Sequence, residues 1–480
     1  MKELLKNNQK SRIGNNQKWR KTMERDNAWK RYSESDLEKI EKINKDYRNF
    51  LDTGKTEREC VAESVRLARE AGYRNLADII QNGENLKAGD KVYIAYMGKS
   101  IVLFHIGSRP IEQGMNILGA HIDSPRIDIK QNPLYEDTEI AYLDTHYYGG
   151  IKKYQWVTIP LAIHGVVVKK DGTILNIVIG EDENDPVVFI SDLLIHLAQT
   201  QLEKKGAKVI EGEDLNIIIG NIPLKDEEKD AVKKNMIRLI KEKYDFEEED
   251  FISAELEVVP AGKAREAGID RSMIMAYGQD DRSCAYTSLI AMLEKQEVET
   301  TACVLLVDKE EIGSVGATGM QSKFFENTLA ELLDRMGIYS ELTLRRVLAN
   351  SKMLSSDVSA AFDPTYASVF EKKNAAYFSK GIVINKFTGS RGKSGSNDAN
   401  AEYIGEIRRI FDKYDVAYQT AELGKVDQGG GGTIAYIMAL YGMNVIDSGV
   451  AVLNMHAPYE VVSKADIYEA VKAYVAFISE

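Results

Sequence analysis

The sequence predicts an α/β protein that is interrupted by a second, mainly β domain. Short runs of apolar and β-branched residues alternate with stretches of helical periodicity, first from residue 35 to about 130 and again from about 262 onward. Several runs end in carboxylates or histidines, which is typical of strand ends that bind ligands in α/β sheets. We therefore predict an α/β domain of residues 1–132 plus 262–480 and an inserted β-rich domain of residues 133–261.

Composition limits the classes of function. The 480 residues suffice for two or three domains, and 44% hydrophobic with 28% charged residues is typical of a soluble globular enzyme. A net charge of −12 argues against nucleic-acid binding, and three cysteines without a CxxC pair argue against a disulfide scaffold or thiolate zinc site. No run reaches the roughly 20 apolar residues of a membrane span, and the basic N-terminus lacks a secretory core. We expect a cytoplasmic protein, with residues 1–30 forming a mobile arm or a helix packed on a partner chain.

The first part of the chain predicts helices and then strands. Apolar residues at helical spacing from Leu37 to Phe50 predict a helix that ends at Gly54. Thr56 and Glu59 form a capping box, which predicts the start of a second helix. Strands are expected at residues 91–97, 101–106 and 115–120, the first two joined as a hairpin.

The insertion is predicted to consist of antiparallel strands with a few helices. One helix is expected at residues 192–202, where it carries His196, and another in the charged segment 225–244, where apolar residues share one stripe. Strands are expected at residues 140–148, 155–168, 173–180, 215–220 and 251–259.

The last part predicts alternating strands and helices joined by two unusual loops. Thr388–Asn400 is rich in Gly, Ser and charge and is expected to be a flexible loop near a site, without the spacing of a P-loop. The glycines of Asp427–Thr433 expose backbone N–H groups that could hold an anion or a peptide carbonyl, with Gly430 a candidate substrate contact; a tight helix entry is the alternative. Strands are expected near residues 273–277, 301–307, 355 and 445–453, and helices at 282–293, 323–336, 434–441 and 465–477, the last one amphipathic.

Candidate metal ligands stand beside the predicted strands. Adjacent carboxylates such as Glu310 and Glu311 repel each other, and a divalent cation makes the pair tolerable; a solvated acidic turn is the alternative. Two histidines and several carboxylates together suit two Zn²⁺-like ions with nitrogen and oxygen ligands and an open position for water. The set in chain order is His121, Asp123, Asp280, Asp281, Glu310, Glu311, Asp357 and His456.

Five motifs carry a resemblance to a known family. They are GAHIDSPRIDIK (Gly119–Lys130), YGQDDR (Tyr277–Arg282), DKEEIGS (Asp308–Ser314), SSDVSAAFDP (Ser355–Pro364) and MHAPYE (Met455–Glu460). With these motifs in this order, the chain from about residue 35 to its end resembles the aspartyl aminopeptidase/vacuolar aminopeptidase I family of di-zinc metallopeptidases. The resemblance implies an αβα proteolytic domain with an inserted dimerisation domain.

The resemblance also implies a role for each metal ligand. Asp280 would bridge two divalent ions, Zn²⁺ in the first place and Co²⁺ or Mn²⁺ otherwise. His121 and Asp357 would complete one site, and Glu311 and His456 would complete the other. The implied activity is removal of the N-terminal residue from peptides by a water that the two ions activate.

Further roles follow from the same resemblance. Glu310 would be the general base, and Asp123 would steady His121. The inserted domain would pair subunits into dimers that build a tetrahedral homododecamer. A histidine of that domain would reach the neighbouring active site; His196 is the first candidate and His164 the second, with an ordinary structural role as the alternative for each.

Two departures leave the substrate preference open. Members of the family that the chain resembles usually carry Asp-Asn where this chain has Asp280-Asp281, and the loop 388–400 is longer and richer in Gly and Ser than expected. A preference for acidic first residues needs a cation, for which Lys386, Arg391 and Lys393 are available, whereas a neutral pocket favours Leu- or Met-type residues. The competing interpretations are a non-catalytic, metal-stabilised assembly or cargo protein and a metal-free glycosidase with two separated carboxylates.

Overall fold

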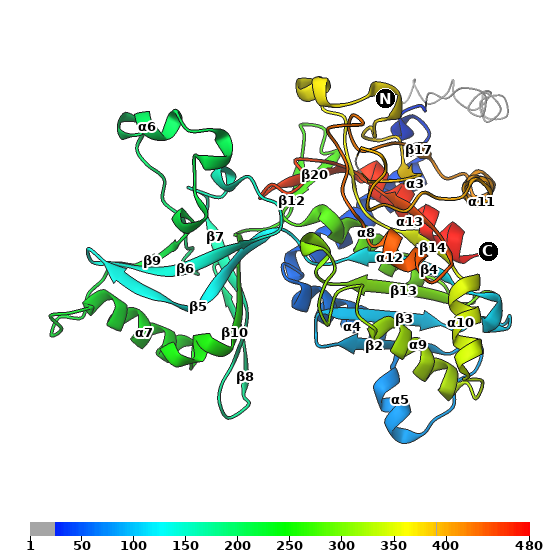
Figure 1. Cartoon of the computed structure of the whole chain (residues 1–480), viewed down its shortest axis with the longest axis horizontal. Coiled ribbons are helices and arrows are strands. Elements are labelled where there is room, and N and C mark those ends of the chain that lie inside the picture. The colour runs from blue at the N-terminus through cyan, green and yellow to red at the C-terminus, as the bar shows by residue number, and fades with distance from the viewer. Residues whose placement is uncertain (1–24, 390) are drawn as a thin grey trace.

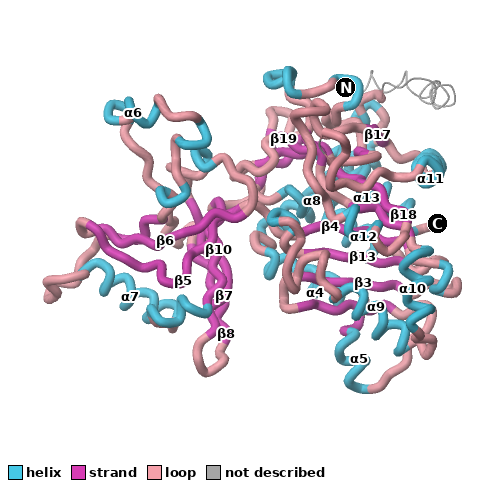
Figure 2. Tube along the Cα trace, in the orientation of Figure 1, coloured by secondary structure: helices cyan, strands magenta, loops and turns pink. Residues whose placement is uncertain are grey.

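The structure, a computed structural model, describes residues 25–389 and 391–480 and has two lobes (Figure 1). The larger lobe holds a sheet between layers of helices, and the smaller lobe is built mainly from strands (Figure 2). The predicted α/β class is confirmed. Among the described residues, no helix combines the length and apolar character needed to cross a membrane. The sequence predicts a mobile arm or a partner-bound helix at residues 1–30. Residues 1–24 of that segment lie outside the described residues, so this stays a prediction.

The sheet of the larger lobe has nine strands in the order β1-β2-β3-β13-β4-β14-β18-β16-β17. Its central strands β13, β4, β14 and β18 run parallel to one another. Their carboxyl ends therefore meet at one edge, where ligands bind in α/β sheets. The strands are β1 (Arg74–Asn75), β2 (Lys91–Tyr96), β3 (Ser100–His105), β4 (Asn116–His121), β13 (Ala302–Val307), β14 (Lys352–Ser355), β16 (Ile382–Asn385), β17 (Tyr418–Thr420) and β18 (Asn444–Gly449).

Helices cover both faces of this sheet and enclose one core on each side. Val304 and Leu306 of β13 pack in one core, and Cys303 and Leu305 pack in the other, as alternation along a strand requires. The first core contains residues of α3 (Glu34–Thr53), α4 (Glu57–Glu70), α8 (Gln279–Leu293), α11 (Ala401–Lys413) and α13 (Lys464–Ile478). The second contains residues of α5 (Leu76–Asn82), α9 (Phe324–Arg335), α10 (Glu341–Asn350) and α12 (Ala435–Ala439).

Local sequence signals explain where the first helices begin. The predicted capping box of Thr56 and Glu59 is present at the start of α4, and Ser33 with Asp36 forms another at the start of α3. The predicted amphipathic character of the last helix is wrong. Nearly every residue of α13 is buried, including Asp466 and Glu469. These two carboxylates can be buried because they accept backbone N–H groups from segments packed around the helix.

The smaller lobe contains a six-stranded antiparallel sheet in the order β8-β7-β10-β5-β6-β9. Helix α7 (Ala231–Tyr244) buries Val232 and Met236 against this sheet, on the stripe that the sequence predicts. All six strands lie between residues 126 and 260; the division at residues 132 and 262 stays a prediction. The strands are β5 (Arg126–Asp137), β6 (Ile140–Tyr148), β7 (Leu161–Val168), β8 (Ile174–Ile179), β9 (Ile217–Gly220) and β10 (Ala254–Pro260).

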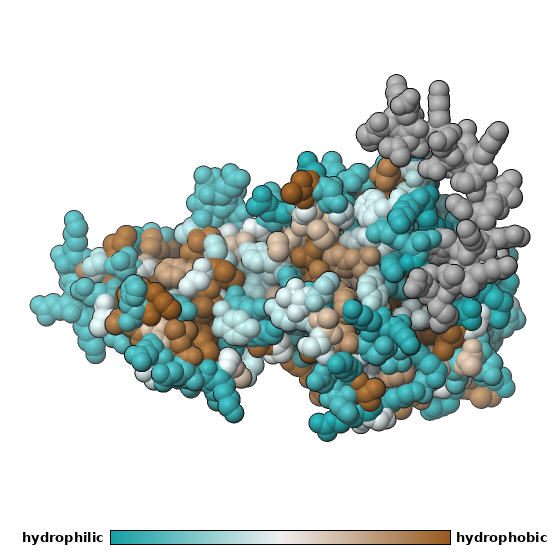
Figure 3. Space-filling model, turned by 90° about the horizontal axis from the view of Figure 1, so that it is seen from above, coloured by the Kyte–Doolittle hydropathy of each residue, from teal (hydrophilic) through white to brown (hydrophobic). Residues whose placement is uncertain are grey.

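The predicted helix at 192–202 is wrong. Only a 3-10 turn at Ile195–Leu197 and the short helix α6 (Gln199–Leu202) form there. Its large apolar residues stay largely exposed in the described structure: Leu194 is 56% exposed and Leu197 is 70% exposed, whereas Ala198 is buried. Residues 251–253 likewise belong to a 3-10 helix, Glu248–Ser253, and not to the strand expected from 251 onward. Seen from above, apolar side chains are grouped on the smaller lobe (Figure 3).

A small third sheet joins the lobes and carries two of the candidate ligands. Its order is β11-β12-β20-β19-β15. Asp280 follows its strand β12, at the start of α8, and His456 lies in the connection from β19 to β20. The strands are β11 (Arg265–Ala267), β12 (Met273–Ala276), β15 (Ser359–Ala360), β19 (Ala451–Leu453) and β20 (Glu460–Ser463).

Candidate metal centre and catalytic pocket

Neighbouring parallel strands bring four of the candidate residues to one edge of the large sheet. His121 ends β4 opposite Val307, the last residue of β13, so Glu310 and Glu311 follow directly beside it. Asp357 follows β14, which pairs with β4 on its other side. The sequence alone places these residues up to 236 positions apart (His121 to Asp357); the parallel pairing makes them neighbours.

Asp280 lies between the two histidines. Its Oδ1 is 3.2 Å from His121 Nε2, and its Oδ2 is 3.3 Å from His456 Nε2. Glu311 Oε2 is 3.5 Å from the same His456 nitrogen, and Glu310 Oε2 is 3.9 Å from the His121 nitrogen. The two oxygens of Asp280 therefore face two separate groups of ligands.

Three sets of side chains have ligand atoms within 4.8 Å of one another, and their donors fit divalent metals. His121 Nε2 and Glu311 Oε1 are buried without a hydrogen-bond partner, which suits atoms that bind a cation. Imidazole nitrogen and carboxylate oxygen are ordinary zinc ligands. The sets are His121 with Glu310 and Asp357, His121 with Asp280 and Glu311, and Asp280 with Asp281 and Asp357.

The cluster places several carboxylates close to one another and to two histidines, and this changes the pKa of its members. Burial raises the pKa of Glu310 to about 7 and raises the pKa of Asp357 well above its usual range, with neighbouring carboxylates adding to the effect. Burial opposes the charged form of His456, yet its contacts with Asp280 and Glu311 raise its pKa to about 10. Burial also opposes the charge of Asp280, but His121 and His456 hold its pKa well below the ordinary value. The cluster therefore attracts positive charge.

The cluster lines a pocket of about 450 Å³ at the edge of the sheet. Gly430 and its glycine neighbours form one wall, at positive φ for Gly430, so the candidate substrate contact lies at the pocket. Val358, Leu423 and Met455 supply apolar surface, and no lysine or arginine is among the described lining residues. Lys386 and Lys393 instead both pair with Asp398, at 2.9 and 3.0 Å.

Comparison with known proteins decides the family. The family profile described as "Aminopeptidase I zinc metalloprotease (M18)" matches residues 50–478. The chain belongs to the M18 family of aminopeptidases. It is thus a metallopeptidase of a zinc family, as the five motifs suggest, and the glycosidase alternative is wrong.

Relatives and solved structures agree with the M18 assignment. The "Probable M18 family aminopeptidase 1" of Clostridium acetobutylicum is 65% identical over 454 residues, covering 94% of this chain and 98% of that protein. The crystal structure of an M18 aminopeptidase from Thermotoga maritima has a TM-score of 0.91 at 46% identity and covers 95% of this chain and 100% of that chain. The Saccharomyces cerevisiae mApe1 dodecamer has a TM-score of 0.73 at 22% identity over 91% of this chain and 96% of that chain, which shows a shared fold.

Asp123 and Glu460 both hold candidate ligands of this M18 chain in place, but only Asp123 was predicted from the sequence. Asp123 is fully buried, and its carboxylate accepts the backbone N–H groups of Glu310 and Glu311 at 3.1 and 3.2 Å. Glu460 was not singled out, although it closes the motif of His456. It accepts the N–H groups of Asp280 and His456 at 2.9 and 2.7 Å, and therefore holds both ligands at the backbone.

The histidines of the smaller lobe lie elsewhere in the aminopeptidase. His196 is exposed in the turn beside α6, and neither the pocket nor the three ligand sets include it. His164 is buried between Glu59 of α4, at 2.8 Å, and Glu181, at 3.1 Å. His164 therefore connects the two lobes within one chain. These contacts agree with the alternative that His164 is an ordinary structural histidine.

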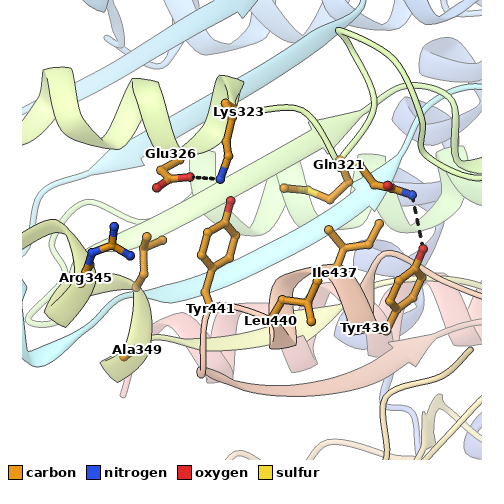
Figure 4. Close-up of a pocket in the computed structure, with 11 residues that line it drawn as sticks. Gln321, Lys323, Glu326, Arg345, Ala349, Tyr436, Ile437, Leu440 and Tyr441 are labelled. Atoms are coloured by element: carbon orange, nitrogen blue, oxygen red, sulfur yellow. Dashed lines mark hydrogen bonds and ion pairs between the residues drawn. The ribbon is translucent and has the colours of Figure 1, made fainter. Parts of the chain in front are cut away.

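A second hollow shares one lining residue, Tyr436, with the pocket of the candidate metal centre. It measures about 550 Å³ and is bounded by α9, α10 and α12 (Figure 4). Lys323 pairs with Glu326 there at 2.6 Å, and Gln321 reaches the Tyr436 hydroxyl at 3.4 Å (Figure 4). Because no histidine is among the described residues that line it, this hollow lacks the donor set of the candidate metal centre.

Proposed function

We propose that this M18 aminopeptidase removes the N-terminal residue of peptides at a centre of two divalent ions, with zinc as the first candidate. The observation that supports the proposal is the position of Asp280 between His121 and His456. In this centre Asp280 would be the ligand shared by both ions, His121 and Asp357 would complete one site, and Glu311 and His456 would complete the other.

When bound, two such ions lower the pKa of a shared water and polarise the scissile carbonyl. Glu310 is the proposed general base: it takes a proton from the attacking water and returns it to the leaving amine. Its side chain lines the pocket, and its backbone N–H is fixed by Asp123. Asp123 also steadies the ring of His121, because its backbone carbonyl accepts from Nδ1 at 3.0 Å and its carboxylate lies 3.3 Å from the same nitrogen.

The exchange of Glu310 for glutamine tests the base. Glu310→Gln keeps the shape of the side chain but cannot accept the proton, so we expect kcat to fall by at least about 100-fold. Bound metal, measured by elemental analysis, should stay at two ions per chain. Glu402→Gln, at an exposed position of α11, is the matched control and should keep full activity. Full activity of Glu310→Gln refutes the role of Glu310, and one ion or none in the wild type refutes the paired centre.

The pocket supports a preference for uncharged first residues. Its wall combines Val358, Leu423 and Met455 with carboxylates and lacks a lysine or arginine among the described residues. An acidic side chain would meet repulsion there, whereas the carboxylates suit the positive N-terminus of a peptide. In a panel of aminoacyl-p-nitroanilides we expect Leu and Met to be cleaved with higher kcat/KM than Asp and Glu. A reversed order contradicts this preference and leaves the metal centre untouched.

Self-association through the smaller lobe is the remaining proposal. Leu193, Leu194, Ile195 and Leu197 are about half to two-thirds exposed, and such grouped apolar residues mark interaction surfaces. The yeast protein of the same fold forms a dodecamer. We propose that dimers formed by this lobe build a tetrahedral homododecamer in which His196 reaches a neighbouring pocket. Sedimentation should give twelve chains per particle, and a monomer that is fully active contradicts the proposal. The cytoplasmic location stays a prediction.

A further inference from the structure

Three consecutive residues of the smaller lobe, Tyr148–Gly150, lie against the candidate metal centre of the larger lobe. They stand at the end of β6, where the chain leaves the six-stranded sheet. The role of this segment was not visible in the sequence, because a Tyr-Gly-Gly stretch between strands is typical of an ordinary turn. Its contacts, however, reach both histidine ligands.

The first contact runs through Asp123. The Tyr148 hydroxyl donates a hydrogen bond to Asp123 Oδ2 at 2.8 Å, and both side chains are buried. That carboxylate lies 3.3 Å from His121 Nδ1 and accepts the N–H groups of Glu310 and Glu311. The tyrosine therefore orients the group that aligns one histidine and both glutamates.

Tyr148 is itself held by its own sheet. The guanidinium of Arg126 lies over its ring at 3.9 Å, and Arg126 is the directly opposite residue on β5. Arg126 is buried and pairs in turn with Glu257 of β10, at 3.2 Å. The position of the hydroxyl is thus fixed through Arg126, which also pairs across the lobes with Glu57 of α4 at 3.5 Å.

The second contact runs through the backbone. The Gly150 carbonyl accepts a hydrogen bond from His456 Nδ1 at 2.8 Å. This bond places the proton on Nδ1 and leaves Nε2, which faces Asp280 and Glu311, free to bind a cation. Gly149 lies between the two contacts at φ +73°, and a methyl group there would stand 3.4 Å from Glu311.

We propose that Tyr148–Gly150 is a positioning segment through which the smaller lobe orients His121 and His456 for metal binding. The inference rests on the proposed metal centre. It adds that the affinity of that centre for metal depends on a hydroxyl and a carbonyl supplied by the other lobe. Outer hydrogen bonds of this kind typically change metal affinity by about 10–100-fold when they are removed.

Tyr148→Phe tests the proposal, because it removes the hydroxyl and keeps the ring over which Arg126 lies. Purified metal-free chain is titrated with Zn²⁺ in competition with a chelator of known affinity. We expect the dissociation constant to rise by about 10-fold or more, and kcat to fall while KM for the peptide stays near the wild-type value. Tyr147→Phe is the matched control: it is the neighbouring residue of β6, 40% exposed, and should change neither quantity.

The outcomes separate this proposal from the one on which it rests. A wild-type chain that binds no metal refutes the proposed centre itself. Wild-type metal affinity in Tyr148→Phe, with normal binding by the wild type, overturns the positioning role alone. If Tyr148→Phe does not fold, Gly149→Ala takes its place, and Gly172→Ala is its control because that glycine also has positive φ but no atom within 4 Å of the added methyl. Equal metal affinity of these two alanine variants then overturns the proposal.

Discussion

We expect the folded protein to lose stability as pH rises because Asp447 must then ionise in a buried position. Replacing Asp447 with asparagine should remove this pH-dependent loss. Asp447 lies on β18 beneath the glycine-rich wall of the catalytic pocket and is 1% exposed. Its Oδ1 accepts a hydrogen bond from the Thr433 hydroxyl at 2.6 Å, and Oδ2 has no partner. Burial raises its pKa from the usual 3.8 to about 7, against the smaller opposing effect of the hydrogen bond from Thr433 and of the nearby Ser355 hydroxyl.

The magnitude follows from the difference between these pKa values. A carboxyl whose pKa is raised on folding stabilises the folded state fully below pH 4, and this contribution is lost as pH rises toward 7. A pKa difference of about 3 corresponds to about 4 kcal/mol, of which about 3 kcal/mol falls between pH 5 and pH 8. With an unfolding entropy near 2.1 cal/mol/K per residue, the chain has roughly 1 kcal/mol/K, so the thermal midpoint should fall by about 3 °C over that range.

The assay compares thermal midpoints at pH 5 and pH 8 for wild type and Asp447→Asn. Asparagine accepts the same bond from Thr433 and can donate to Ser355, which stands opposite Asp447 on β14. The pH-dependent fall should therefore be about 3 °C smaller in the variant. Asp412→Asn, exposed on α11, serves as control and should follow the wild type. Parallel curves for wild type and Asp447→Asn at both pH values refute the reasoning.

Two further predictions concern the metal centre. A chelator should inactivate the enzyme and lower its thermal midpoint, because Asp280, Glu310 and Asp357 then repel one another without a cation, and added Zn²⁺ should restore both; an unchanged midpoint contradicts this. Gly449→Ala should weaken Zn²⁺ binding in a chelator titration, since the added methyl would stand 1.9 Å from the backbone oxygen of Asp357 and force that ligand to move; unchanged affinity shows that the loop adapts instead.

Elements with complete local signals could be predicted from the sequence. The capping box of α4 and the hairpin of β2 and β3 each depend on residues close together in the sequence, and both form as expected. Helices α10 and α11 were not predicted, although Leu344, Val347 and Leu348 of α10 show helical spacing. Residues 192–202 contain many apolar side chains, but most of the large ones stay exposed in the described structure, so the predicted helix forms only as a 3-10 turn and the short α6.

The residues of the candidate site that stand at strand ends could be predicted from the sequence, whereas those that act through tertiary hydrogen bonds could not. His121, Glu310, Glu311 and Asp357 stand at strand ends, and parallel pairing brings such ends together, so a sequence pattern indicates them. Glu460 and Tyr148 act through hydrogen bonds to backbone or to Asp123 from other sheets. Their contribution depends on tertiary contacts that leave no period or spacing in the sequence.

The division of the centre between sheets has a consequence for folding. The cores of the large sheet and of the smaller lobe consist of separate sets of apolar residues, so each can form without the metal ligands. The candidate ligands include crowded acids that oppose their own burial, and His121 and His456 offset the charge of Asp280. Docking of Tyr148–Gly150 supplies the hydroxyl and the carbonyl that orient these two histidines. Metal binding and the joining of the lobes therefore stabilise the same arrangement, and each should strengthen the other.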